Sequence, residues 1–343
     1  MESRERLRIL VVGCRRGAAF MDVASEDPGL ELAGLVDINP ERLAETARRF
    51  GLDSSRSFAS LEEAFQRVEA DILIVASPTA LHFRHTMQGL GVGMHVLCEK
   101  PLTMSRAEAY AMRDEASKQR RHLNVVQNAR YAPQWLKCRE LVASGLIGEV
   151  AHLEMTFRRW RLPGGLHHAV LFNHGVHHID IVRSVLDVEP AWVRAVEWDP
   201  PWPREEGSRG EGFGRFVTLT GQATNGCMVS YHASYGETGR TSSPLGDMRI
   251  VGSKGVLEAG GYSDFDPKVW HYRLAKPTGQ DVEERIPVAP VSFREYDRAV
   301  VNNLVRAIRA GRPSETDIEG HLKTLEWLFQ AQDDIDRNKK QAT

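Results

Sequence analysis

Short, almost continuously hydrophobic runs recur along the first third of the chain, and amphipathic stretches separate them. The runs lie at residues 7–12, 30–36, 71–76, 94–98 and 122–126. Uninterrupted apolar runs of this length are typical of parallel strands buried on both faces, whereas the stretches between them have helical spacing. Strands that alternate with helices in this way predict a doubly wound parallel sheet.

The pattern changes after Val126. Strand candidates then follow one another with few helices between them, at Val150–Phe157, Trp192–Trp198, Gly214–Thr220, Cys227–His232, Met248–Val251 and Trp270–Leu274. Such a series predicts a large, mostly antiparallel sheet in an α+β domain. Helical apolar spacing predicts helices over 293–310 and 318–335, with a frayed polar tail from Asn338. We therefore expect two domains, 1–126 and 127–343, with a mobile loop at Pro200–Gly214.

The composition favours a globular protein without a nucleic-acid or membrane partner. The 343 residues exceed what one ordinary core accommodates, and 42% of them are hydrophobic while 26% are charged. A net charge of −2 leaves no basic footprint for nucleic acid. No apolar stretch approaches the ~18 residues that cross a bilayer, and the charged segment 1–8 is unlike a signal peptide. The four cysteines lack paired spacing, so we expect reduced thiols and a cytoplasmic location.

The turn after the first predicted strand is a candidate phosphate-binding loop. Gly13-Cys14-Arg15-Arg16-Gly17 leads into a helix, and a dinucleotide site needs glycine there so that the backbone can approach the pyrophosphate. Only Gly13 and Gly17 meet this need, because Arg15 stands where a second glycine is expected. Arg15 or Arg16 would instead place a cation beside the phosphates. An ordinary strand-turn-helix connection explains the segment equally well.

Asp37 ends the second predicted strand, 24 residues after Gly13. A carboxylate at that place accepts hydrogen bonds from the ribose hydroxyls of adenosine and repels a 2′-phosphate. The alternative is a loop residue or a helix cap. Asp37 favours NAD over NADP, although the two arginines of the preceding loop keep NADP open.

The tripeptide Glu99-Lys100-Pro101 ends the apolar run at 94–98. Because proline cannot continue a central strand, Lys100 is expected at the carboxyl end of a strand, where open α/β sheets bind their ligands. An ammonium there could bind a cofactor ribose and a substrate oxygen together. Taken alone, the tripeptide also fits a solvated lysine at a strand-loop junction.

With these residues, the chain resembles the glucose-fructose oxidoreductase/inositol dehydrogenase (Gfo/Idh/MocA) family of nicotinamide-dependent enzymes. The family pattern is a strand, T/S-P-x-x-x-H, a helix and G-x-H-V-x-x-E-K-P, which residues 77–82 and 93–101 carry in order. The resemblance extends from about Leu7 to the last helix. It implies a Rossmann domain in which further cofactor contacts come from Ser77, Pro78, Thr79, His82, Glu99, Lys100 and Asn128.

A second family motif, D-x-G-x-H-x-x-D, opens a helix in the second half. Gly175, His177 and Asp180 match it, while Asn173 replaces its first aspartate. Histidine suits proton transfer because its ordinary pKa lies near neutrality. The resemblance implies that His177 and Lys100 act on one substrate oxygen, and that Asn173 and Asp180 orient His177 or bind a substrate hydroxyl. An amide cannot hold an imidazolium electrostatically, so Asn173 weakens the inference of activity.

The remaining candidates around this motif stay open. His174 and His178 would lie one turn apart and could share Zn²⁺, but no third ligand has a recognisable spacing, so we expect no metal. The glycine pair that precedes the family motif is displaced to Gly164-Gly165, which puts the pocket shape in doubt. Three further residues, Tyr231, His232 and Tyr235, either line the substrate side or are ordinary sheet residues, and Trp160 either approaches the cofactor or packs at an interface.

The resemblance implies an NAD-dependent dehydrogenase that acts on a secondary alcohol of a sugar, inositol or nucleotide sugar. Its partners would be this small molecule and further copies of the chain, in a homodimer or homotetramer. One alternative is an NAD-dependent glycosidase on the same fold, which would release an aglycone without net NADH. The other is a regulator that binds a dinucleotide without turnover, for which the altered loop and Asn173 speak.

Overall fold

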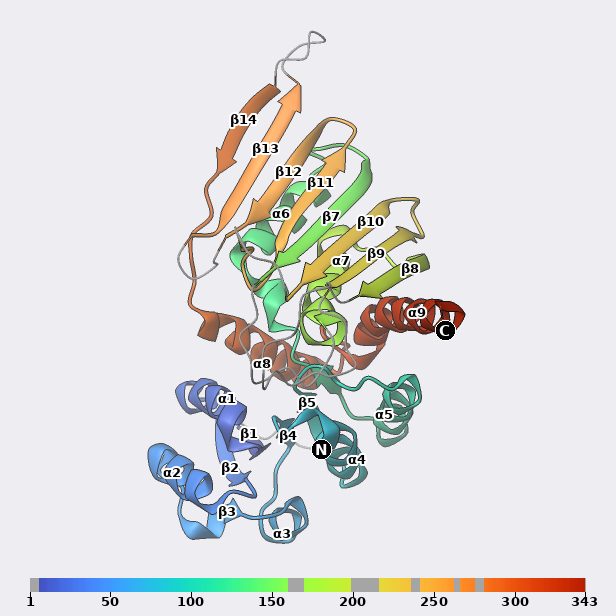
Figure 1. Ribbon diagram of the computed structural model, residues 1–343. Helices are drawn as coiled ribbons and strands as arrows, with labels where there is room; N and C mark the ends of the chain where they lie inside the picture. The colour runs from blue at the N-terminus through green and yellow to red at the C-terminus, as the bar shows by residue number, and fades with distance from the viewer. Residues whose placement is uncertain are drawn as a thin grey trace. The chain divides into compact units, whose positions relative to one another are not determined.

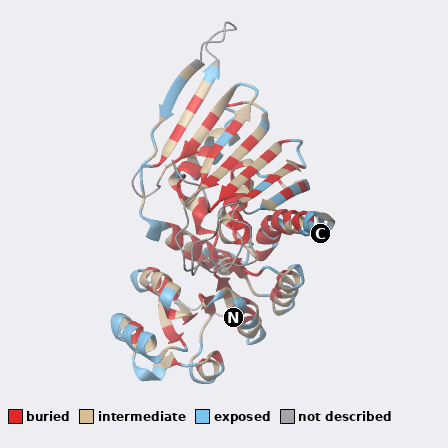
Figure 2. Ribbon diagram, viewed as in Figure 1, coloured by how far each residue is buried: buried red, intermediate tan, exposed pale blue. Residues whose placement is uncertain are grey.

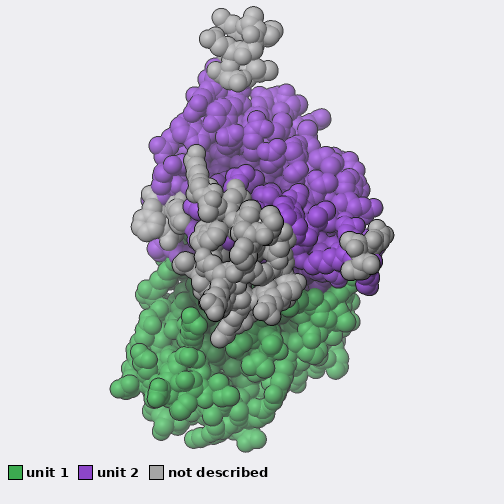
Figure 3. Space-filling model, in the orientation of Figure 1, with its two compact units in different colours: residues 1–128, 294–322 green, residues 129–293, 323–343 purple. Residues whose placement is uncertain are grey.

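The computed structural model describes residues 6–159, 170–198, 216–235, 241–261, 266–274 and 281–342. Trp160, Gly164-Gly165, His167 and the expected loop Pro200–Gly214 lie outside these ranges. The chain clusters into two compact units, Met1–Asn128 with Arg294–Leu322, and Ala129–Phe293 with Lys323–Thr343 (Figure 3). Residues 294–322 thus cluster with the first unit, whereas the sequence pattern assigned them to the second domain.

The first unit is built on a parallel sheet of six strands, all within residues 6–159, which are described without a gap. Their order is β3-β2-β1-β4-β5-β6, and every neighbouring pair is parallel. The strands are β1 (Leu7–Val12), β2 (Leu30–Val36), β3 (Ser57–Phe58), β4 (Ile72–Val75), β5 (His95–Cys98) and β6 (Leu123–Val125). The doubly wound parallel sheet is confirmed, and only β3 was missed, because two residues carry no detectable period.

Helices connect these strands, and several begin at side-chain caps. They are α1 (Cys14–Glu26), α2 (Pro40–Phe50), α3 (Leu61–Arg67), α4 (His82–Gly91) and α5 (Arg106–Gln119), with the 3₁₀ turns η1 (Ser54–Arg56), η2 (Thr79–Leu81) and η3 (Asn128–Tyr131). Asn39, Ser60 and Ser105 accept backbone N–H bonds at the starts of α2, α3 and α5. The helix α1 has no such side-chain cap.

A segment from the far end of the chain completes the first unit. Helix α8 (Phe293–Ala310) places Arg298 against Glu26 at the end of α1, with 2.5 Å between Nη2 and Oε2. Further along, Val125 N–H donates to the Thr316 carbonyl over 2.9 Å, and the Asn124 amide donates to Thr316 Oγ1 over 3.2 Å. These bonds tie residues 294–322 to the edge strand β6 and to α1, which accounts for their place in the first unit.

The second unit contains a sheet of eight strands in its described part, in the order β14-β13-β12-β11-β7-β10-β9-β8. The strands are β7 (Val150–Arg158), β8 (Pro190–Trp198), β9 (Phe216–Ala223), β10 (Met228–Ser234), β11 (Asp247–Gly252), β12 (Gly255–Gly260), β13 (Lys268–Leu274) and β14 (Asp281–Ile286). All neighbouring pairs are antiparallel except β7 and β10. The α+β prediction is confirmed. Two strands were missed, because β12 is short and flanked by glycine and β14 is mostly charged.

Helices cover one face of this sheet and leave the other without a helix among the described residues (Figure 1). Helix α6 (Pro133–Ala143) packs on β12 and β13, and α7 (Val176–Leu186) packs on β7. Buried and less buried positions alternate along the strands, as Figure 2 shows. In the described part of the chain, no helix combines the length and apolar character that a membrane crossing requires.

The last helix, α9 (Ile318–Ala342), runs beyond its expected end. Asn338 donates to the Ala195 carbonyl over 3.3 Å, and the Lys339 ammonium lies 2.6 Å from a Glu197 carboxylate oxygen. The expectation of a frayed tail from Asn338 was therefore wrong, because these polar side chains bind β8.

If α8 belongs to the first unit, a cavity in it should loosen that unit. Leu304 is 1% exposed, and Leu304→Ala should destabilise the first unit by about 2–5 kcal/mol. Amide hydrogen exchange should report this as faster exchange in β1 and β4, with β9 and β10 unchanged. The exposed Arg306→Ala is the control. Loss of protection confined to β9 and β10 would contradict the division.

Candidate functional site

The turn between β1 and α1 is shaped by two close approaches. Gly13 alone separates the strand from the helix and has a φ of +94°, and a Cβ there would lie 2.4 Å from the Ala76 carbonyl oxygen. A Cβ on Gly17 would lie 2.5 Å from Val11 Cγ1. Both glycines are therefore required by packing within the fold, which is the ordinary explanation that the sequence left open. The turn is short because α1 begins at Cys14.

The start of α1 nevertheless suits an anion. Its first turn contains no acidic residue, and Gly13 provides no side-chain cap for the amides. Arg15 is exposed in this turn, and no described residue forms an ion pair with it. Burial, as the main cause, raises the pKa of the Cys14 thiol to about 12, so no thiolate opposes an anion there. The residues present thus fit the pyrophosphate of a dinucleotide.

Asp37 holds the same turn from β2. Its Oδ2 accepts the Cys14 N–H over 2.8 Å, its Oδ1 accepts the Asn39 N–H over 2.9 Å, and Arg42 lies 3.5 Å away. A carboxylate accepts about four hydrogen bonds, so Asp37 retains capacity for ribose hydroxyls. Beside it, Ile38 exposes 90% of its surface. Nothing in the sequence singles out Ile38, because single exposed apolar residues are common on protein surfaces.

His82 joins the two loops that follow β4 and β5. It is buried, with Nδ1 2.8 Å from the Pro101 carbonyl oxygen and Nε2 2.8 Å from the Ser77 carbonyl oxygen. Carbonyl oxygens only accept, so both ring nitrogens donate and the ring is an imidazolium. Burial lowers the pKa of His82, but Cys98 and the two carbonyls raise it to about 9. We correct the predicted cofactor contact of His82, because its ring nitrogens instead fasten the loops that carry Ser77 and Lys100.

The other residues of the T/S-P-x-x-x-H segment lie at the carboxyl end of β4. Ser77 is half-buried, and its Oγ lies 3.0 Å from Nδ1 of His85. Pro78 is exposed and Thr79 half-buried at the start of η2. The sequence predicts cofactor contacts at this carboxyl end of the parallel strands, and Pro78 and Thr79 are placed to provide them.

Lys100 lies in a cluster of charged groups at the end of β5. Arg16 pairs with both Glu99 and Asp297, and Asp297 accepts a hydrogen bond from Asn128 over 2.8 Å. Glu99 also accepts the backbone N–H of Lys100 over 3.0 Å. Desolvation lowers the pKa of Lys100, Glu99 opposes this, and Arg16 adds to it. Two predictions change here. Arg16 and Asn128 were expected at the cofactor, but their polar groups contact carboxylates of the fold.

In the second unit, Asn173 and His174 meet at one tyrosine. Both lie in a π-helical turn, η4 (Leu171–Gly175), a distortion that often marks functional sites. The Tyr235 hydroxyl lies 2.9 Å from Nδ2 of Asn173 and 2.5 Å from Nδ1 of His174, whose ring stacks on Phe157. The Asn173 Nδ2 group can only donate, so the Tyr235 hydroxyl accepts from it. Tyr235 thus belongs to this cluster, a choice that the sequence left open.

His177 follows in the first turn of α7 and is half-buried. His178, by contrast, is fully buried, with Nε2 3.3 Å from the Pro244 carbonyl and Nδ1 2.9 Å from the Tyr231 hydroxyl. Nε2 must donate to the carbonyl, so Nδ1 accepts from Tyr231 and keeps no lone pair for a metal. This contradicts the alternative of Zn²⁺ shared by His174 and His178. Among the described residues, no three His, Cys, Asp or Glu side chains gather as metal ligands would.

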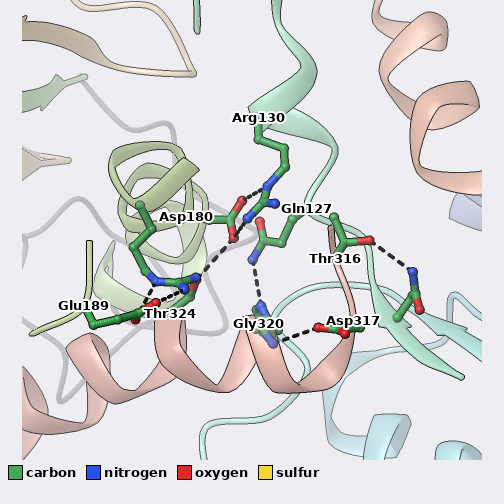
Figure 4. Close-up of polar contacts among 11 residues, drawn as sticks. Gln127, Arg130, Asp180, Glu189, Thr316, Asp317, Gly320 and Thr324 are labelled. Carbon is green, nitrogen blue, oxygen red and sulfur yellow. Dashed lines mark hydrogen bonds and ion pairs between the residues drawn. The ribbon is translucent and has the colours of Figure 1, made fainter. Parts of the chain in front are cut away.

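Asp180 requires a correction. Its side chain is 1% exposed, and its two oxygens each lie 2.7 Å from the Arg130 guanidinium. Figure 4 shows the two side chains facing each other. Thr324 of α9 donates to the same carboxylate over 3.2 Å. Because the pair is bidentate and buried, the Asp180 carboxylate is turned into the second unit and away from solvent. Asp180 therefore fastens α7 to η3 and α9, in place of the predicted substrate contact.

Each unit thus brings its own predicted residues together. The first gathers the loop 13–17, Asp37, the segment 77–82 and residues 99–100 at one edge of the parallel sheet. The second gathers Asn173 and His177 at the start of α7, with Tyr235 at the end of β10. Asp297 and Tyr235 contact these residues from distant parts of the chain, and no local sequence motif predicts their contacts.

Comparison with known proteins places both units. Residues 7–127 match the family model described as "Oxidoreductase family, NAD-binding Rossmann fold", and residues 135–258 match the "GFO/IDH/MocA C-terminal domain". Together the two matches span more than half of the chain.

Individual proteins agree with these matches. "Uncharacterized protein y4oX" of Sinorhizobium fredii is 24% identical over 325 residues, 91% of this chain and 87% of that protein. Inositol 2-dehydrogenase of Leifsonia xyli is 31% identical over 184 residues, about half of each chain. An oxidoreductase from Agrobacterium radiobacter, solved with NAD⁺, L-tartaric acid and magnesium, has the same fold, with a TM-score of 0.82 and 20% identity over 97% of both chains.

His82 should make stability depend on pH. A histidine pKa raised from 6.5 to about 9 by folding contributes stability that is fully present below pH 6.5 and is lost as pH rises through 9. The contribution of His82 is about 3 kcal/mol at its largest. Urea unfolding should therefore show that wild type and His82→Gln differ in free energy of unfolding by about 3 kcal/mol less at pH 9 than at pH 6.5. An equal difference at both pH values would contradict the imidazolium.

Proposed function

Because the chain belongs to the Gfo/Idh/MocA family of oxidoreductases and has its NAD-binding Rossmann fold, we propose that it oxidises or reduces a sugar-type secondary alcohol. The substrate class is a sugar, inositol or nucleotide sugar. When bound, the nicotinamide supplies the hydride acceptor or donor, and the chain supplies binding, orientation and proton transfer. The observation that carries the proposal is Lys100, held at the carboxyl end of β5 among charged groups.

Lys100 binds the reacting oxygen of the substrate. Its ammonium stabilises the negative charge that develops on this oxygen when the hydroxyl proton leaves. The lowered pKa of Lys100 supports this role, because an ammonium with a weakened hold on its proton is a stronger hydrogen-bond donor. Glu99, whose carboxylate accepts the backbone N–H of Lys100, favours the charged form of this lysine and so opposes the effect of desolvation on its pKa.

His177 is the proton acceptor in the oxidative direction. Its place in the first turn of α7 and its partial exposure support this role, whereas buried His178 has both ring nitrogens engaged within the fold. Asn173 turns its amide toward Tyr235, and we assign to this pair the binding of a substrate hydroxyl. In this role Asn173 acts as a hydrogen-bonding group and does not need the negative charge of the family aspartate.

The cofactor we propose is NAD rather than NADP. Asp37 carries a buried carboxylate at the start of α1, where it accepts the Cys14 N–H, and its negative charge would repel a 2′-phosphate. Gly13, Cys14 and Gly17 bring the backbone to the pyrophosphate, Arg15 supplies the cation, and Ile38 offers an apolar surface for the adenine. Ser77, Pro78 and Thr79 contact the nicotinamide side from the end of β4.

The lysine carries the first test. Lys100→Ala should lower kcat by about 10²–10³-fold, because charge stabilisation in the transition state is lost. The dissociation constant for NADH should change by less than about tenfold. Absorbance at the NADH band across a panel of polyols and nucleotide sugars measures the first, and fluorescence titration measures the second. The control is Lys118→Ala, at an exposed lysine of α5 that pairs with nearby Glu115.

Three outcomes would separate the alternatives. Unchanged kcat in Lys100→Ala would remove the lysine from the mechanism. Release of an aglycone without net NADH would favour the glycosidase. Tight NADH binding without turnover on any panel member would favour the regulator.

We further propose that the uncovered face of the large sheet binds a second copy of the chain, in a homodimer or as part of a homotetramer. Trp192, Val196 and Trp198 of β8 expose 37%, 52% and 39% of their surfaces. Toward the other end, charges of both signs alternate across neighbouring strands, as in the pair Arg249–Glu258 at 3.0 Å. A face with apolar and mixed-charge ends suits a twofold partner of the same kind.

All four cysteines are unpaired and buried, which supports a cytoplasmic location.

Sedimentation velocity tests this interface. The wild-type chain should sediment as a dimer or tetramer at micromolar concentration, and Val196→Glu should shift it toward the monomer by burying a charge. Val92→Glu, at a valine of the first unit with 54% exposure, should leave assembly unchanged. A monomeric wild type, or equal dissociation by both variants, would contradict the interface.

A further inference from the structure

Arg16 has a fully specified set of partners. Its Nε lies 2.6 Å from Glu99 Oε1, while Nη1 and Nη2 lie 2.7 Å and 2.6 Å from the two oxygens of Asp297. The guanidinium also lies 4.5 Å from the ring centroid of Phe20. This is a bidentate pair with one carboxylate and a single bond to another, in a partly buried site. The planar face and the donors of Arg16 are thus directed into the first unit.

The neighbouring Arg15 differs in every respect. It is exposed, it lies one position earlier in α1, and no ion pair binds it among the described residues. Two adjacent arginines in one helical turn therefore have different tasks. Only Arg15 has a guanidinium available to an anion at the start of α1.

The carboxylates around Arg16 lead directly to the lysine. Glu99 uses its other oxygen to accept the backbone N–H of Lys100 over 3.0 Å. Asp297 comes from α8 and also accepts a bond from Asn128 over 2.8 Å. Arg16 thus links α8, the start of α1 and the end of β5, and it sets where the Glu99 carboxylate lies beside Lys100.

We propose that Arg16, fixed by Asp297, is a positioning residue that orients Glu99 and balances its charge at Lys100, while Arg15 alone serves the phosphates. This inference rests on the proposed function, because it concerns the lysine that would bind the substrate oxygen. It adds a residue from α8, Asp297, to a site otherwise built at the ends of parallel strands.

The charges fix the direction of each effect. Glu99 raises the pKa of Lys100 and Arg16 lowers it, while Asp297 favours the charged form of Arg16. Removal of Arg16 leaves Glu99 to act on Lys100 unopposed, so the pKa of Lys100 should rise. Removal of the Asp297 charge leaves Arg16 to neutralise Glu99 more completely, so the pKa of Lys100 should fall. A pair that does not act electrostatically on Lys100 would give no such opposed shifts.

The experiment measures Lys100 directly, without turnover. The full-length protein is labelled with [¹³Cε]lysine, and the NMR signal of Lys100 is assigned by its loss in Lys100→Arg. Titration without cofactor should give a Lys100 pKa that is higher by about one unit in Arg16→Gln and lower in Asp297→Asn. Arg16→Lys keeps the positive charge but not the bidentate guanidinium, and should bring the Lys100 pKa most of the way back to the wild-type value. Arg15→Gln should leave this pKa unchanged.

NADH fluorescence titration of the same variants completes the design. Arg15→Gln should weaken binding by about tenfold, and Arg16→Gln by much less. The reverse pattern, with an unmoved Lys100 pKa in Arg16→Gln, would assign Arg16 to the phosphates and overturn the proposal. If Arg16→Gln does not fold, Asp297→Asn decides, since an unmoved pKa there also overturns it. A missing dehydrogenase activity would instead overturn the proposed function and leave these titrations readable.

Discussion

Glu99 is a buried carboxylate at the end of β5, and its negative charge is compensated by the guanidinium of Arg16. Glu99 is 7% exposed, and Asp297 beyond it is 1% exposed. Two buried negative charges without compensation would be strongly destabilising. One guanidinium satisfies both through short bonds. The position of Lys100, and with it the candidate chemistry of the first unit, depends on this compensation.

The second constraint on the same edge is His82. Because its ring bonds two carbonyls, the loops after β4 and β5 are held at one separation. His82 thus fixes the position of Ser77 in one loop relative to Lys100 in the other. In the second unit, the Arg130–Asp180 pair has the equivalent task, since it fastens the helix that begins at His177. In each unit, a buried ionic contact positions a group that the proposed reaction uses.

Local patterns predicted most of the fold. The period of apolar residues located β1, β2 and α8 to the residue. Side-chain pairing over long distances was not predictable. Asp297 stands 281 positions from Arg16, and Tyr235 stands 62 from Asn173. No period connects such residues, so motif matches assigned Arg16, His82 and Asp180 to ligands, although their polar groups are satisfied within the fold.

A crystal structure of the protein with NADH bound would show which arginine contacts the phosphates. We expect the pyrophosphate at the start of α1 beside Arg15, with the Lys100 ammonium near the nicotinamide ribose. Arg16 should still bind Glu99 and Asp297 in that structure. A guanidinium of Arg16 that leaves both carboxylates to bind the phosphates would contradict the account.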